Sequence, residues 1–95
     1  MATLLPTDEI VARLAMIPNW ELSDKSITRK YLFDSFLDAI SFVNMVAKKA
    51  EEIDHHPEIY ISYKEVNLSI TTHSKGGITE RDFRLVGLIN QLKFM

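Results

Sequence analysis

Two stretches near the middle of the chain alternate between apolar and polar residues. Apolar side chains stand at every second position: Ile59, Ile61 and Tyr63 in the first stretch, and Val66, Leu68 and Ile70 in the second. Successive side chains of a β-strand point to opposite faces, so this period of two predicts two strands that each have an apolar face. We expect a turn at Lys64-Glu65 to join them as a hairpin. In that register Ile61 faces Leu68, and Ile59 faces Ile70.

A different spacing marks the stretch before this hairpin, residues 36–53. Apolar residues recur there every three or four positions: Phe36, Ile40, Val43, Ala47 and Ala50, with Ala39, Phe42, Val46 and Ile53 widening the stripe. This period is typical of one face of an α-helix, and Ser35 is the expected N-cap. A stripe this wide predicts contact with a sheet and with another subunit.

The rest of the chain supplies shorter elements. We expect a helix that begins at Thr7 as its N-cap, strands over 20–23 and 27–33 around a turn at Asp24-Lys25, and a last helix from about Thr79. The resulting order is α-β-β-α-β-β-α. It predicts an α+β fold of two layers, a four-stranded antiparallel sheet with helices packed on one face, in a single domain over 1–95.

Composition narrows the classes of function. The chain has 95 residues, a net charge of −2 and no cysteine. Without cysteine, disulfides, zinc-thiolate sites and cysteine nucleophiles are excluded. The basic residues form no stripe, so we expect no direct binding of nucleic acid. The sequence has no signal-peptide pattern and no apolar run long enough to cross a membrane, and we expect a cytoplasmic protein, with the nucleus as the alternative.

The three histidines of the chain, His55, His56 and His73, fall within one short window. The expected hairpin register places His56 opposite His73, so the imidazoles should lie close together. Imidazole both gives and takes protons near neutral pH, which makes proton transfer the first chemistry to consider. Three imidazoles could also form an open zinc site. Adjacent residues of an extended backbone point to opposite sides, however, so the spacing favours acid–base chemistry over a metal.

Plainer roles remain open for each of these residues. The histidines could satisfy backbone groups at the start of a strand. Thr79 and Asp82 fit a capping box, in which Asp82 occupies the third helical position. Glu51 would be a solvated helix residue, and Trp20 a residue of the core or of an interface.

Taken together, these residues resemble the pterin-4a-carbinolamine dehydratase family. The family pattern has an acidic or similar residue, a His-His-Pro or His-Asn-Pro, an aromatic residue, a histidine or tryptophan, and a final aspartate at fixed gaps. It is matched here by Glu51, His55-His56-Pro57, Tyr63, His73 and Asp82. The resemblance is strongest over 50–92 and extends more weakly back to Trp20-Glu21.

The resemblance implies a reaction and a site. Members of the family dehydrate 4a-hydroxytetrahydrobiopterin to quinonoid dihydropterin, which recycles the cofactor of aromatic amino acid hydroxylases without a metal or organic cofactor. By matching position, His55 and His73 would be the acid–base pair and His56 a polarising partner. Asp82 would orient an imidazole or stabilise its protonated form. The implied contacts to the pterin come from Glu51, Asp54, Thr71, Thr72 and Trp20.

The resemblance also implies partners. Family proteins in animals bind a homeodomain transcription factor through a helical surface that otherwise builds their tetramer. A non-enzymatic interaction module is therefore the alternative function. The apolar stripe of residues 36–53 fits this role and also fits a homo-oligomer, either a dimer or a tetramer.

Overall fold

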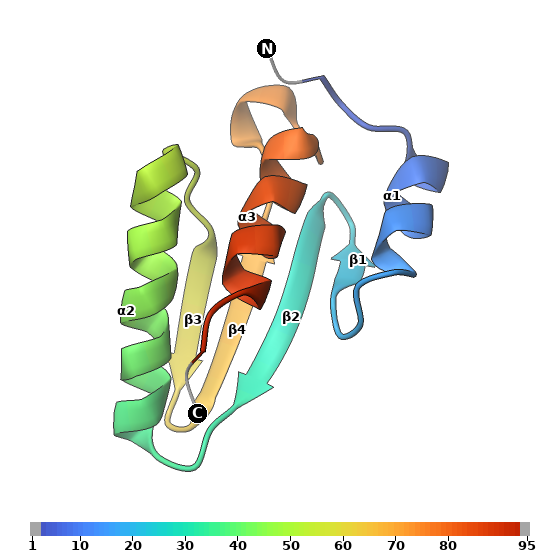
Figure 1. Cartoon of the computed structure of the whole chain (residues 1–95). Coiled ribbons are helices and arrows are strands. Elements are labelled where there is room, and N and C mark those ends of the chain that lie inside the picture. The colour runs from blue at the N-terminus through green and yellow to red at the C-terminus, as the bar shows by residue number, and fades with distance from the viewer. Residues whose placement is uncertain (1–2, 94–95) are drawn as a thin grey trace.

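The computed structural model describes residues 3–93 and has the expected order of elements. The elements are α1 (Thr7–Leu14), β1 (Glu21–Ser23), β2 (Ser26–Leu32), α2 (Phe36–Ile53), β3 (Glu58–Ser62), β4 (Glu65–Ile70), a 3-10 helix η1 (His73–Lys75) and α3 (Glu80–Asn90). Figure 1 shows α2 and α3 side by side across the sheet, with α1 next to β1. The predicted α+β fold is confirmed.

The four strands form one antiparallel sheet in the order β1-β2-β4-β3. On the central strand β4, Val66, Leu68 and Ile70 are buried, whereas the residues between them are partly exposed. This alternation is the predicted one, because the apolar face of the strand packs against the helices and the polar face does not. The core therefore lies between the sheet and the helix layer.

The register predicted for the second hairpin is wrong by two residues. Ile59 pairs with Leu68 and Ile61 with Val66, so the turn is Tyr63-Lys64. Tyr63 adopts a positive φ of 54°, a conformation that a non-glycine residue takes infrequently and that allows the tight turn. A shift of two keeps every side chain on its predicted face. In the observed register His56 is not opposite His73, and both residues lie beyond the paired strands.

Two smaller expectations near the N-terminus also differ from the structure. Pro6, in an extended conformation, occupies the N-cap position of α1, and its side chain makes no capping hydrogen bond. Thr7 is therefore the first helical residue and not the N-cap. Strand β1 begins at Glu21, which pairs with Thr28 of β2, so Trp20 lies one residue before the strand. The Trp20 side chain is buried, and its ring N–H donates to Asn90 of α3.

Helix α2 begins and ends where the sequence predicts. Ser35 accepts a hydrogen bond from the Asp38 N–H at 3.0 Å, which satisfies one of the free donors of the first turn. The residues that α2 buries are Ala39, Phe42, Val46 and Ala50. Phe36, in the neighbouring stripe, keeps 46% of its surface exposed. Within the described residues no helix is long and apolar enough to cross a membrane.

Arg13 of α1 ties this short helix to the start of α3. Its guanidinium group donates to both carboxylate oxygens of Glu80, at 2.7 and 2.5 Å, and also to Glu9 at 2.6 Å. The hydrogen bonds from Arg13 lower the pKa of Glu80. The Glu80 side chain is largely exposed and the Arg13 side chain is partly exposed, so solvent and salt weaken the interaction.

We expect Glu80→Gln to lower the free energy of unfolding at neutral pH by less than about 1 kcal/mol. The folded-state pKa of Glu80 lies below its ordinary value of 4.5, so the stabilisation is present above that value. It is lost as the pH falls through the lowered pKa, where wild type and variant should converge. Urea unfolding across this pH range measures the difference. Glu21→Gln is the control, because the Glu21 side chain has no partner among the described residues; an equal loss there would contradict the prediction.

Candidate active site

At the end of α2, the side chains of two neighbouring histidines face different surroundings. Asp54 adopts a left-handed conformation with φ 51°, and the His55 N–H donates back to the Ala50 carbonyl at 3.0 Å. This is the hydrogen-bond pattern by which many helices end in a tight reversal. As a result the His55 side chain is only 7% exposed, whereas His56 faces solvent.

The start of α3 supplies a buried carboxylate. The Thr79 N–H donates to Asp82 Oδ2 at 2.7 Å, and the Thr79 hydroxyl accepts from the Arg81 N–H at 3.2 Å. This is the predicted capping box, and it is confirmed. Asp82 is fully buried, which is costly for a carboxylate unless its oxygens are hydrogen-bonded.

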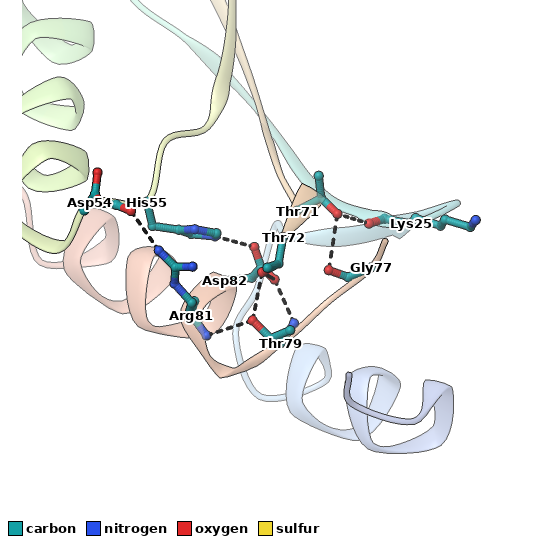
Figure 2. A network of polar contacts seen from close by, with 9 residues as sticks. All are labelled: Lys25, Asp54, His55, Thr71, Thr72, Gly77, Thr79, Arg81 and Asp82. Carbon is teal, nitrogen blue, oxygen red and sulfur yellow. Dashed lines mark hydrogen bonds and ion pairs between the residues drawn. The ribbon is translucent and has the colours of Figure 1, made fainter. Parts of the chain in front are cut away.

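Asp82 also joins α3 to the loop after α2 and to the end of β4, as Figure 2 shows. Its Oδ1 lies 2.7 Å from His55 Nε2, and its Oδ2 accepts from the Thr72 hydroxyl at 2.8 Å. Thr72 in turn lies 2.8 Å from the Thr79 hydroxyl. Because a carboxylate only accepts hydrogen bonds, His55 Nε2 must carry a proton. The network therefore fixes both the orientation and the tautomer of this imidazole.

A pocket of about 220 Å³ opens beside this network. It is lined by Asp54, His55, His56, Thr71, Thr72, His73, Ser74 and Arg81. His73 reaches it as the first residue of η1, after an isolated bridge between Thr72 and Gly77 ends the strand pairing. The structure thus places all three histidines around one pocket, although the register expected to bring them together is wrong.

The residues predicted to contact the pterin lie in three places: in the pocket lining, beside His56, and, for Trp20, in the core. Asp54, Thr71 and Thr72 line the pocket; the Asp54 carbonyl accepts from the Arg81 guanidinium at 2.8 Å, and the Thr71 hydroxyl donates to the Lys25 carbonyl at 2.6 Å (Figure 2). Glu51 is outside the lining and pairs with the His56 ring. It can therefore act on the pocket through His56.

Trp20, unlike the other predicted site residues, neither lines the pocket nor bonds to a histidine that lines it. Its indole N–H donates to Asn90 Oδ1 at 3.0 Å, at the far end of α3 from Asp82. Eight residues of helix separate these two positions, a rise of about 12 Å. The ring packs edge-on against Tyr31 with centroids 6.4 Å apart. Trp20 therefore belongs to the core, as the alternative interpretation of the sequence had it.

Sequence reasoning missed Arg81 and Ser74, which also line the pocket. Arg81 carried a usable signal. A basic residue in the first turn of a helix opposes the helix dipole, so its presence there suggests another role. Ser74 carried no comparable signal. Among residues 3–93, no group of three or more histidine, aspartate or glutamate side chains is arranged to hold a metal ion.

A comparison with protein-family models matches residues 3–92 to the model described as pterin 4 alpha carbinolamine dehydratase. The chain belongs to this family. Among curated relatives of the family, a Picosynechococcus protein is 47% identical over 97% of this chain and 100% of its own length. An Acidobacterium capsulatum protein is 47% identical over 97% of this chain and 99% of its own. Both are named provisionally as pterin-4-alpha-carbinolamine dehydratases.

A solved structure agrees with the family assignment, and a second shares the fold. A crystal structure from Brucella melitensis, named a transcriptional coactivator/pterin dehydratase, matches with a TM-score of 0.87 and 33% identity. It covers 93% of this chain and 96% of the other. A pterin dehydratase-like protein, named as a RuBisCO assembly factor in the alpha-carboxysome, shares 17% identity with a TM-score of 0.61, which shows the fold alone.

Proposed function

We propose that this protein dehydrates 4a-hydroxytetrahydropterins to quinonoid dihydropterins, and so recycles the cofactor of aromatic amino acid hydroxylases. One observation carries the proposal: three imidazoles surround a single pocket, and a buried carboxylate holds one of them in a fixed orientation. Membership of the dehydratase family supports the choice of a pterin as the substrate.

The reaction needs one proton donor and one proton acceptor. The bond from C4a to the hydroxyl oxygen breaks, and a donor protonates that oxygen so that it leaves as water. A ring nitrogen gives its proton to the acceptor, and its electron pair forms the new carbon–nitrogen double bond. No net proton is consumed, so a pair of histidines that exchange roles can serve many turnovers.

His55 and His73 are the proposed acid–base pair. The Asp82 carboxylate orients His55, and this removes the entropy of positioning the ring before the reaction. His73 makes no side-chain hydrogen bond within residues 3–93 and is exposed at the pocket, so it is available to the substrate. His56, paired with Glu51, would polarise the substrate, with Asp54, Thr71 and Thr72 binding polar edges of the pterin.

The direct test adds purified protein to freshly generated 4a-hydroxytetrahydropterin and follows the quinonoid product by absorbance. We expect a rate well above the spontaneous reaction and no change when a metal chelator is present. A rate equal to the spontaneous one would overturn the proposal. It would favour the interaction module instead, in line with the coactivator name of the Brucella structure.

We also propose that α2 joins two copies of this chain. The apolar stripe that the core leaves half-covered includes Phe36, Ile40 and Val43, and Leu37 beside it is largely exposed. This surface is continuous along one helix, and pairing with the same helix of a second copy would remove it from water.

Replacing Phe36 with aspartate should therefore lower the mass in solution to that of a monomer, with wild type measured by light scattering as a dimer or tetramer. The change is at the first residue of α2, where a negative charge suits the helix dipole, so the fold should persist. Met16→Asp is the control, because Met16 is 84% exposed and lies in the turn that follows α1. A monomeric wild type, or an unchanged mass for the variant, would contradict this assembly.

A further inference from the structure

The histidine pocket is small for a complete pterin substrate. Its volume of about 220 Å³ lies below the roughly 300–1,000 Å³ typical of small-molecule sites. If the proposed function holds, the bicyclic ring can occupy this pocket, but any chain attached to the ring must leave it. The surface next to the pocket then determines which substituted pterins bind well.

A larger groove adjoins the pocket at the start of α3. It has a volume of about 1070 Å³ and is lined by Thr3, Leu5, Ser74, Lys75, Glu80, Arg81, Phe83 and Arg84. Ser74 and Arg81 line both the groove and the histidine pocket, so the two lie next to each other. The hollow on α2, lined by Ala47, Lys48, Glu51 and Glu52, shares no lining residue with the pocket.

The groove is basic. Lys75, Arg81 and Arg84 contribute three positive charges, and the one acidic residue, Glu80, is already bound by Arg13. Neither the Lys75 nor the Arg84 side chain makes a hydrogen bond or an ion pair with any residue that the structure describes. Cations that lie together without a carboxylate partner repel one another, and an anion between them removes this repulsion.

The groove also has an apolar side, formed by the half-buried side chains of Leu5 and Phe83. An apolar wall with basic groups around it suits a short carbon chain that ends in a phosphate or a carboxylate. We propose that this protein prefers pterins with an anionic group on the ring's side chain, and that Lys75 and Arg84 bind this group in the groove. This inference rests on the proposed function, because it places the ring in the histidine pocket.

Binding of stable oxidised pterins tests the inference without turnover. Three probes share the ring, and titration calorimetry measures the binding of each: 6-hydroxymethylpterin, which is neutral in its side chain, its phosphate ester, and pteroylglutamate, which carries carboxylates. We expect at least one of the two anionic probes to bind about ten- to a hundredfold more tightly than the neutral one, an advantage that high salt reduces. The stronger of the two identifies the anion as phosphate or carboxylate.

The double variant Lys75→Gln, Arg84→Gln should abolish this advantage and leave the affinity for the neutral probe unchanged. The matched control Lys30→Gln, Lys93→Gln removes the same charge far from the groove and should bind like wild type. With reactive carbinolamines, the double variant should raise KM for the anionic substrate alone and leave kcat intact.

Equal binding of neutral and anionic probes would overturn this inference and leave the proposed function standing. So would an advantage that persists in the double variant. If no pterin binds at all, the proposed function fails together with the inference. These outcomes separate the two claims.

Discussion

Replacing His73 with alanine should lower kcat for dehydration by about 10²–10⁴-fold, the usual contribution of a positioned acid or base. His73 is exposed, belongs to a 3-10 helix of three residues, and makes no side-chain hydrogen bond in the described part of the chain. Its loss should therefore leave the fold intact. The effect should fall on kcat and little on KM, because the proton moves only in the transition state.

The assay of quinonoid product, run beside thermal unfolding, separates a catalytic from a structural effect. Lys25→Ala, at an exposed turn outside the pocket lining, is the matched control for changing a surface side chain nearby. Turnover of His73→Ala at the wild-type rate would remove His73 from the mechanism. A variant that unfolds would mean that the ring supports the structure instead.

Of the substitutions considered, Asp82→Ala should lower the free energy of unfolding most. The change leaves the Thr79 N–H, the Thr72 hydroxyl and the His55 ring without their shared acceptor in a fully buried position. Each unsatisfied buried group costs roughly 1–3 kcal/mol, and loss of the cap adds to this. We expect the free energy of unfolding, measured with urea, to fall by about 3–5 kcal/mol. A loss below 1 kcal/mol would contradict the network.

Asp82→Asn separates the structural role of this residue from its role at the site. The amide oxygen can still accept from Thr79 and Thr72, so much of the stability should return. The amide nitrogen then faces His55 and can only donate, which forces the opposite tautomer on the ring. We expect Asp82→Asn to fold at ordinary temperature yet to dehydrate the substrate at least about 100-fold more slowly. Near-normal activity in this variant would show that Asp82 serves only the fold.

The sequence predicted the fold well where a local pattern decides the structure. Ser35 caps α2 as expected because capping depends on the residues of a single turn. The register of the second hairpin depended on one backbone angle, at Tyr63, and no glycine or asparagine marks that turn. Apolar alternation alone could not distinguish two registers that differ by two residues, since both bury the same side chains.

The site was predictable to a similar extent. The histidines could be grouped from their positions along a hairpin, and the capping role of Asp82 from its spacing to Thr79. The sequence presented capping and catalysis as rival explanations for Asp82. In the structure Asp82 Oδ2 accepts from the Thr79 N–H at the start of α3, and Asp82 Oδ1 pairs with His55. The same carboxylate therefore serves the cap and the site, so both explanations can hold. Long-range contacts such as Trp20 with Asn90 leave no local pattern and could not be predicted.

Because Asp54 at the end of α2 is left-handed, positions 55 and 56 differ in how freely they can change over evolution. The inward one, His55, is tied to Asp82, so exchanging it disturbs the interior as well as the chemistry. The outward one, His56, pairs with Glu51 at the surface and can be exchanged with little penalty to folding. Within this scaffold, divergence of the reaction or its substrate should begin at position 56, long before position 55 is free to vary.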